Sequence, residues 1–127
     1  MSRFAYKGAP PRSWIRVELV APDGSMRRLE AVADTGNPLP LIVGSTVMDE
    51  FRHLSGPGTD TNFGRLEGGF LRLNIPDTGF AAMIFGYASD RVTDAIRASH
   101  ADFEALVGLP LLRKLEFGGN AVDFWIS

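Results

Sequence analysis

The chain has 127 residues, a length that suits one domain with its own hydrophobic core. Its formal net charge is −2, with acidic and basic residues interspersed, so no basic patch for nucleic acid or an anionic membrane stands out. It has no cysteine, which excludes disulfides and thiolate metal sites. No apolar run approaches the ~20 residues of a membrane helix, and we expect a cytoplasmic protein.

The N-terminal part of the chain predicts an arm followed by a β-hairpin. Residues 1–13 contain two consecutive prolines and no hydrophobic period, so we expect a loose arm ahead of a single domain over 14–127. Trp14–Val20 alternates apolar and charged residues, which predicts a half-buried strand. A Pro-Asp-Gly-Ser turn follows, and Met26–Ala33 returns as a second strand that leads to Asp34.

The next segment predicts a strand, a helix and a loop. Leu41–Val43 is typical of a short buried strand. Ser45 or Thr46 is a candidate N-cap, and Asp49, three residues after Thr46, is a candidate capping-box partner. Apolar residues at helical spacing then predict one short amphipathic helix. It ends where Gly56–Gly69, a polar and glycine-rich stretch, predicts a mobile loop.

The second half of the chain predicts four strands and two helices. The strands are expected at Phe70–Ile75, Phe80–Tyr87, Phe103–Val107 and Ala121–Ile126. The helices are expected at Ser89–Ser99, capped by Ser89, and at Leu109–Leu115, with Pro110 in its first turn. The second of these strands is continuously apolar, which predicts burial on both faces. Together the elements predict a mainly β fold, a small closed β-barrel with one or two short helices.

The tripeptide Asp34-Thr35-Gly36 lies between two apolar strands. An Asp in such a setting is costly to bury without a partner, so it is either a turn cap or part of an active site, and we favour the active site. The tripeptide recurs at Asp77-Thr78-Gly79, directly after Pro76. There Pro presets φ and Gly accepts a positive φ between two alternating runs, which predicts a four-residue turn.

The first of these tripeptides, after Ala31-Val32-Ala33, resembles the catalytic loop of the retropepsin-like aspartic peptidases. Leu106–Leu115 is similar to the second signature of that family, an apolar pair and a Gly that open a short helix. The resemblance in pattern covers residues 14–126 and implies a closed barrel of the acid-protease type. Asn37 stands where members usually carry Ala, Ser or Thr. Bacterial peptidases that process sporulation factors look similar at this position.

The resemblance implies an aspartic endopeptidase that needs no cofactor and no metal. Two carboxylates held close together share one proton, so that one acts as a base on water and the other as an acid on the peptide carbonyl. One chain of this size supplies one such Asp, which implies a homodimer with Asp34 of each chain at the two-fold axis. By the resemblance Asp34 is the catalytic acid and base. Thr35 braces the two loops, and Gly36 lets the backbone approach the dyad.

By the same resemblance the loop at 56–69 is a flap over an extended peptide or protein substrate, with Gly64, Leu66 and Gly68 as candidate substrate-binding residues. The alternative is a catalytically inactive retropepsin-like β-domain that serves peptide binding or assembly. Other hydrolase classes have weaker support. The sequence has no His-Glu-x-x-His motif for a metal-dependent enzyme and no Gly-x-Ser-x-Gly elbow for a serine enzyme.

Overall fold

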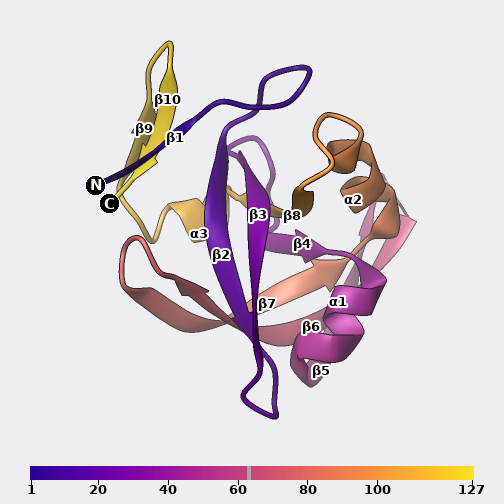
Figure 1. Cartoon of the computed structure of the whole chain (residues 1–127). Helices are drawn as coiled ribbons and strands as arrows, with labels where there is room; N and C mark the ends of the chain where they lie inside the picture. Colours follow the sequence, from indigo (N-terminus) through magenta and orange to yellow (C-terminus); the bar gives the residue numbers. More distant parts are fainter. Residues whose placement is uncertain (63) are drawn as a thin grey trace.

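Six strands close into a β-barrel, as the sequence predicted (Figure 1). The structure is a computed structural model that describes residues 1–62 and 64–127, with 55% strand and 15% helix. Pairing of Leu19 with Leu73 closes the barrel between its first and last strands, and a seventh strand extends the sheet beyond it. In spatial order these strands are β2 (Trp14–Val20), β3 (Met26–Asp34), β8 (Phe103–Gly108), β4 (Leu41–Val43), β7 (Phe80–Ala88), β6 (Gly64–Ile75) and β5 (Arg52–Thr61).

The two ends of the chain form a second, three-stranded sheet beside the barrel (Figure 1). Its order is β1 (Ser2–Ala5), β10 (Asp123–Ile126) and β9 (Phe117–Gly119). The expectation of an arm without regular structure was therefore wrong. Phe4 explains the order, because its side chain is buried and its ring packs on Trp14 with 4.9 Å between ring centroids.

Three short helices decorate the barrel: α1 (Ser45–Phe51), α2 (Asp90–Arg97) and α3 (Leu109–Leu112). The predicted cap of α2 is confirmed, because Ser89 Oγ accepts a hydrogen bond of 3.2 Å from the N–H of Val92. None of the helices in the described residues is long and apolar enough to cross a membrane. The helices instead cover parts of the barrel surface and its ends.

The start and the end of α1 differ from the prediction. Its N-cap is Gly44, which makes no side-chain capping bond, and the hydroxyl of Ser45 donates to Asp90 instead of capping its own helix. The helix ends at Phe51 and the chain continues directly into β5. As a result Leu54, which falls within the predicted helix, lies in β5 and is 65% exposed.

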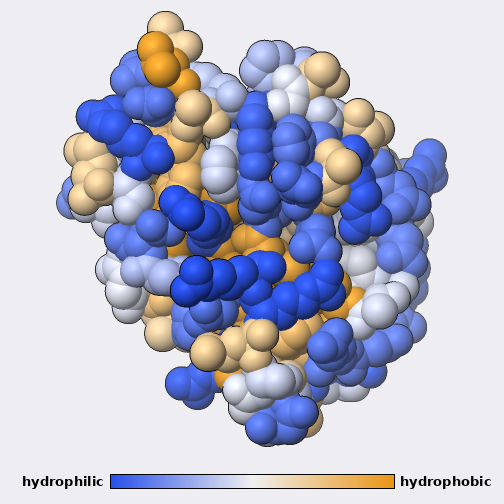
Figure 2. Space-filling model, viewed as in Figure 1, coloured by the Kyte–Doolittle hydropathy of each residue, from blue (hydrophilic) through white to orange (hydrophobic). Residues whose placement is uncertain are grey.

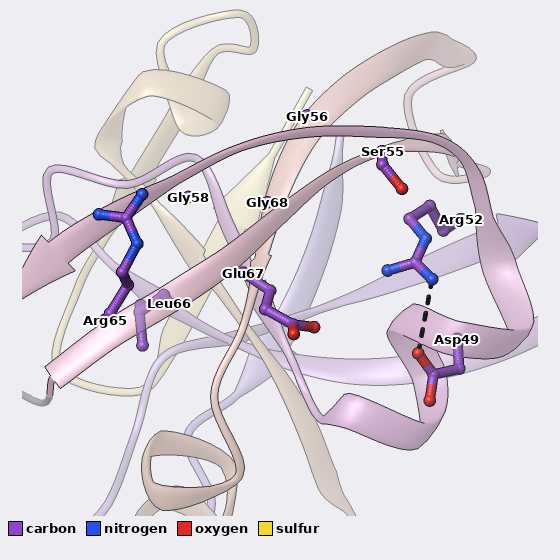
Figure 3. A pocket seen from close by; sticks show the side chains of 9 residues that line it. All are labelled: Asp49, Arg52, Ser55, Gly56, Gly58, Arg65, Leu66, Glu67 and Gly68. Carbon is purple, nitrogen blue, oxygen red and sulfur yellow. Dashed lines mark ion pairs between the residues drawn. The ribbon is translucent and has the colours of Figure 1, made fainter.

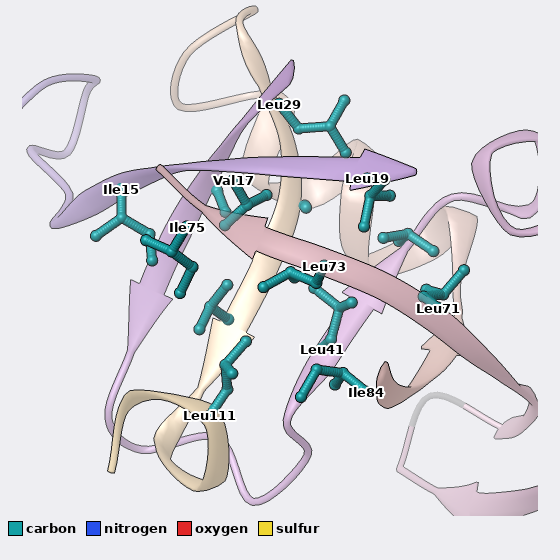
Figure 4. Close-up of a cluster of buried hydrophobic side chains, with 14 of the residues drawn as sticks. Ile15, Val17, Leu19, Leu29, Leu41, Leu71, Leu73, Ile75, Ile84 and Leu111 are labelled. Carbon is teal, nitrogen blue, oxygen red and sulfur yellow. The ribbon is translucent and has the colours of Figure 1, made fainter. Parts of the chain in front are cut away.

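The buried hydrophobic side chains form two clusters. The larger one fills the barrel with aliphatic side chains from every wall (Figure 4), and burial of each stabilises the fold by about 1.5–3 kcal/mol. The smaller one lies between α2 and the outer face of the sheet. It consists of Val32, Ile42, Val92, Ile96, Phe103 and Leu106. Because strand side chains alternate, Asp34 shares the face of Val32, which is the face that α2 covers.

The surface around β2 and β3 is largely hydrophilic (Figure 2), as the alternation in these strands predicted. Arg28 of β3 and Glu18 of β2 pair across this face at 3.3 Å, and Lys7 pairs with Glu30. The ammonium of Lys7 also lies 3.9 Å from the ring centroid of Trp14. Burial lowers the pKa of Lys7 from its ordinary value. These contacts attach the N-terminal segment to the barrel.

The stretch expected to be a mobile loop is a long β-hairpin made of β5 and β6. Its neighbour β7 was predicted to be buried on both faces, and this was wrong. Only Ile84 and Gly86 are buried in β7, and Met83 is 48% exposed. The outer face of β7 carries Phe85, whose ring contacts Phe70 and Tyr87 at centroid distances of 4.9 and 5.1 Å. The apolar run therefore supplies one buried face and one partly exposed aromatic row.

Candidate functional site

Asp34 is the last residue of β3 and lies beside Gly108, the last residue of the parallel strand β8. The two predicted motifs, more than seventy positions apart in the chain, are thus brought together by a single strand pair. Asp34 is half-buried, and its side chain belongs to the face of the sheet that α2 covers. A carboxylate is thereby presented at the end of a buried strand without being enclosed.

The loop after Asp34 holds the carboxylate in one orientation. The N–H of Gly36 donates to Asp34 Oδ1 at 2.9 Å, and the N–H of Asn37 donates to the backbone carbonyl of Asp34 at 3.2 Å. Thr35 and Gly36 are exposed. The tripeptide is therefore a tight turn. It fixes the carboxylate of Asp34 and exposes Thr35 and Gly36 to solvent.

The same loop is fastened to the start of α3. The side-chain Oδ1 of Asn37 accepts a hydrogen bond of 2.8 Å from the N–H of Leu39, and its backbone carbonyl accepts one of 3.1 Å from Leu109. The N–H of Gly108 donates to the carbonyl of Pro40 at 3.1 Å. Asn37, which differs from the usual residue of the family that this loop resembles, thus stabilises the loop locally.

Gly108 allows this close approach because it has no side chain. A Cβ at this position would lie 1.9 Å from the carbonyl oxygen of Leu39 and 2.8 Å from that of Asn37. Both neighbours are backbone atoms and cannot rotate away. The glycine of the second motif is therefore required for contact between β8 and the loop that carries Asp34.

A hollow of about 350 Å³ opens beside Asp34, and we call it the α2 hollow. The loop that carries Asp34 forms one side of the hollow, and α2 forms the other. Its lining residues are Asp34, Gly36, Asn37, Pro38, Val92, Ala95, Ile96 and Leu106. The buried floor comes from the smaller hydrophobic cluster, so an apolar surface lies next to a carboxylate.

A second hollow of about 420 Å³, the flap hollow, lies on the other side of Asn37 and Pro38, which line both spaces. It extends from this loop to the tip of the β5–β6 hairpin. Its other lining residues are Leu39, Ile42, Thr59, Asp60, Thr61, Asn62 and Leu66. The hairpin tip thus lies near the loop that carries Asp34, and the two hollows share Asn37 and Pro38 in their walls.

The three flap candidates have different places in the structure. Leu66 is buried and lines the flap hollow next to the loop. Gly64 has φ +93° in the exposed hairpin turn and lines neither hollow. Gly68 packs on the ring of Phe85. Of these three, only Leu66 is brought close to the Asp34 loop.

Gly68 also borders a third hollow, of about 690 Å³, under the hairpin (Figure 3). Figure 3 shows the side chains of Arg52 and Glu67 directed into this space, with Arg52 paired to Asp49 at 3.7 Å. Asp34 does not line this hollow. The lining of this third hollow contains both acidic and basic side chains, and it is not part of the site around Asp34.

The second tripeptide forms a turn, as predicted. It connects β6 and β7, the N–H of Thr78 donates to the carbonyl of Ile75 at 3.0 Å, and Gly79 has φ +74°. Asp77 pairs with Arg16 at 3.9 Å across the surface. Two copies of one tripeptide therefore have different surroundings, and only Asp34 borders an apolar hollow.

Sequence reasoning missed the α2 hollow and the loop residue Pro38. Ser89–Ser99 was predicted as a helix, but nothing local placed its residues Val92, Ala95 and Ile96 next to Asp34. Among the residues that the structure describes, no three His, Asp or Glu side chains gather as candidate metal ligands. No protein-family model, no curated protein and no solved structure matches the chain.

Proposed function

We propose that the protein is a retropepsin-type aspartic endopeptidase that acts as a homodimer. The observation that carries the proposal is the setting of Asp34. Its carboxylate is held by the N–H of Gly36, its loop is fastened on Gly108, and it borders an apolar hollow beside a hairpin. These features match what a catalytic Asp requires: fixed orientation, backbone support and a neighbouring space for substrate.

The chemistry needs two carboxylates, and each chain contributes one. At the two-fold axis Asp34 and Asp34 of the partner subunit share a proton, because both cannot ionise at close range. The ionised carboxylate takes a proton from water as the water oxygen bonds to the peptide carbonyl carbon, while the protonated carboxyl group donates its proton to the carbonyl oxygen. The tetrahedral intermediate then breaks its C–N bond, and the amine leaves with a proton returned by the dyad. The exposed Thr35 is available to brace the two loops.

The β5–β6 hairpin is the element that would close over the substrate. Its tip already borders the Asp34 loop through Leu66 and the flap hollow. Closure would exclude water from the dyad, and an extended peptide would pair with strand edges on either side of it.

One observation favours the alternative of a non-catalytic peptide-binding domain. β1 pairs with β10 of the same chain, so the terminal sheet is complete within one protomer and requires no partner strands. A protein that stays monomeric at every concentration would carry a single Asp34 without its partner. Sedimentation over a range of concentrations separates the two functions, because only the peptidase requires a dimer.

The activity is tested by incubating the protein with a mixed peptide library from about pH 4 to about pH 7.5. Cleaved products are identified by mass spectrometry. We expect wild type to cut, Asp34→Asn to be inactive and Asp77→Asn, the matched control in the second tripeptide, to cut normally. Cuts that persist in Asp34→Asn, or no cut by a folded dimer, would contradict the proposal.

A further inference from the structure

We propose that the outer face of β5, β6 and β7 is a docking surface for an amphipathic helix of another protein, with an acidic residue of that helix placed opposite Arg72. The inference goes beyond the proposed function and holds whether or not the protein cleaves peptides. We call this surface the aromatic face, and it consists of Leu54, Phe70, Met83, Phe85 and Tyr87.

The strand register places these five side chains on one side of the sheet. Phe70 is paired with Leu54 of β5 and with Phe85 of β7, and directly paired residues point to the same side of a sheet. Met83 and Tyr87 lie two positions before and after Phe85, so alternation puts them on this side as well. The rings of Phe70 and Tyr87 meet that of Phe85 edge to face, at centroid distances of 4.9 and 5.1 Å. The aromatic face is therefore one apolar surface across three neighbouring strands.

The aromatic face is open to solvent. Leu54 is 65% exposed and Met83 is 48% exposed, and the three aromatic side chains are half-buried. Removal of such apolar surface from water is favourable. A contiguous exposed apolar patch of this kind marks an interaction site.

A helix already covers the adjoining part of the same sheet face. α2 contributes Val92 and Ile96 to the cluster that contains Ile42 of β4, and Ile42 is 2% exposed beneath it. Ile42 is paired with Tyr87, which lies at the border of the aromatic face, so the covered and the open part are continuous. The chain itself thus shows that an amphipathic helix fits this side of the sheet.

The dimensions of the aromatic face match one further helix. The face extends about 13 Å along β7 from Met83 to Tyr87 and about 10 Å from β7 to β5, at about 3.3 Å per residue and about 4.8 Å per strand. A helix is about 10 Å wide and rises about 1.5 Å per residue, so about nine residues of one helix cover the face. α2, which covers the adjoining part, has eight residues.

The edge of β5 argues against an added strand as the occupant. β5 is the last strand of the seven-stranded sheet, but it contains Pro57, and its register with β6 shifts between Gly56 and Thr59. Proline has no N–H to donate and a bulge twists the edge away, so both obstruct pairing with another strand. The occupant therefore covers the face and does not extend the sheet.

Charge favours a partner protein over a second copy of this chain. Arg72 is paired with Met83, so its exposed side chain borders the aromatic face, and it forms no ion pair with any residue that the structure describes. β5, β6 and β7 carry two carboxylates. Asp60 pairs with Arg65, and Glu67 points to the opposite side by alternation. Two copies stacked on this face would leave both arginines unmatched, whereas a helix with Asp or Glu supplies the missing carboxylate.

The test starts from a phage-displayed library of helices of about fourteen residues with randomised surface positions, selected on the immobilised full chain. We expect the enriched helices to carry apolar residues at i, i+3 or i+4, and i+7, together with an Asp or Glu. The best helix is synthesised as a labelled peptide, and its Kd is measured by fluorescence anisotropy. A selection that enriches no such helix would overturn the inference.

Variants of exposed residues then locate the binding site. Met83→Glu and Leu54→Glu should each raise the Kd about tenfold or more, because each places a charge under the apolar side of the helix. Met26→Glu is the matched control, since Met26 is 63% exposed on β3 outside the aromatic face, and its Kd should stay within about twofold of wild type. Arg72→Glu should weaken the acidic peptide, and Lys in place of the acidic residue of the peptide should restore binding. Equal Kd values for wild type and Met83→Glu would overturn the inference.

Two further measurements separate the other possible occupants. Sedimentation compares the self-association of wild type and Met83→Glu, and co-sedimentation with vesicles of phosphatidylcholine and phosphatidylglycerol compares their lipid binding. We expect equal self-association and no vesicle binding. Weaker self-association of Met83→Glu would assign the face to a contact between copies, and vesicle binding that Met83→Glu abolishes would assign it to a lipid surface. Either result would overturn the inference, and neither depends on peptide cleavage.

Discussion

The carbonyl oxygen of Leu39 occupies the space in which a side chain on Gly108 would begin, 1.9 Å from the position of an added Cβ. This contact joins the loop that carries Asp34 to the end of β8, and two backbone hydrogen bonds reinforce it. The position of the candidate catalytic carboxylate therefore depends on a glycine of the neighbouring strand, paired with Asp34 at the ends of β3 and β8.

Gly108→Ala should displace this loop, because the atoms that the new methyl group meets are backbone atoms. We expect a loss of about 1–3 kcal/mol in the free energy of unfolding, typical of overpacking, together with loss of peptide cleavage. Urea unfolding and the library assay measure the two effects. Gly44→Ala is the control, since its Cβ would meet side-chain atoms no closer than 3.2 Å. Equal stability of the two variants would contradict the role assigned to Gly108.

The base of the flap hairpin packs on one aromatic ring. A Cβ on Gly56 would lie 2.2 Å from Phe85 Cε2, and all its near neighbours belong to that ring. Gly56→Ala should destabilise wild type but have a much smaller effect in the Phe85→Ala background, with a coupling energy of roughly 0.5–3 kcal/mol. A double-mutant cycle by urea unfolding measures it. Additive effects would show that the ring and the glycine act independently.

Asp90 links the starts of α1 and α2. The hydroxyl of Ser45 donates to Asp90 Oδ2 at 2.7 Å and its backbone N–H donates to Oδ1 at 2.9 Å, and these bonds lower the pKa of Asp90. A pKa lower in the folded than in the unfolded state contributes stability above the unfolded value of about 3.9, and this contribution disappears as the pH falls through the folded pKa.

Wild type should therefore exceed Asp90→Asn in free energy of unfolding at about pH 7, and the difference should be smaller at about pH 2.5. Urea unfolding at both pH values measures it. Asp94→Asn is the control on the same helix, because the pair of Asp94 with Arg97 is exposed and 3.8 Å long. A stability difference for Asp90→Asn that is independent of pH would contradict the linkage.

The barrel could be predicted from the sequence because its strands have strong local signals. Trp14–Val20 and Leu41–Val43 were predicted with the bounds that the structure has. Alternation is a local consequence of one buried face, so it can be recognised without knowing the partner strand. The start of α2 was equally local, because a Ser cap bonds within its own turn.

The errors arose where distant residues decide the structure. Ser45 or Thr46 was expected to cap α1, but the N-cap is Gly44, and Asp90, forty-five positions after Ser45, accepts the hydrogen bonds of Ser45. Gly56 and Gly68 were read as signs of a mobile loop, whereas both pack on Phe85. Residues 1–13 were predicted to lack regular structure, because a single apolar residue such as Phe4 makes no periodic pattern. Burial of Phe4 nevertheless orders the strand Ser2–Ala5.

The candidate site was predictable in one part only. Asp34-Thr35-Gly36 and the segment around Gly108 form two recognisable motifs, and a parallel strand pair joins them. The α2 hollow was not predictable, because its lining comes from the Asp34 loop, α2 and β8. No local pattern states that these three segments meet.

The most direct measurement of the central claim is cleavage of one library-derived peptide by a fixed amount of wild type mixed with increasing Asp34→Asn. If the dyad forms across a dimer, mixed dimers are inactive. At dimer-forming concentrations, activity should then fall to about half with an equal amount of variant and to about a tenth with a ninefold excess. Activity that stays constant at every ratio would show that each chain works alone and would contradict the shared Asp34 dyad.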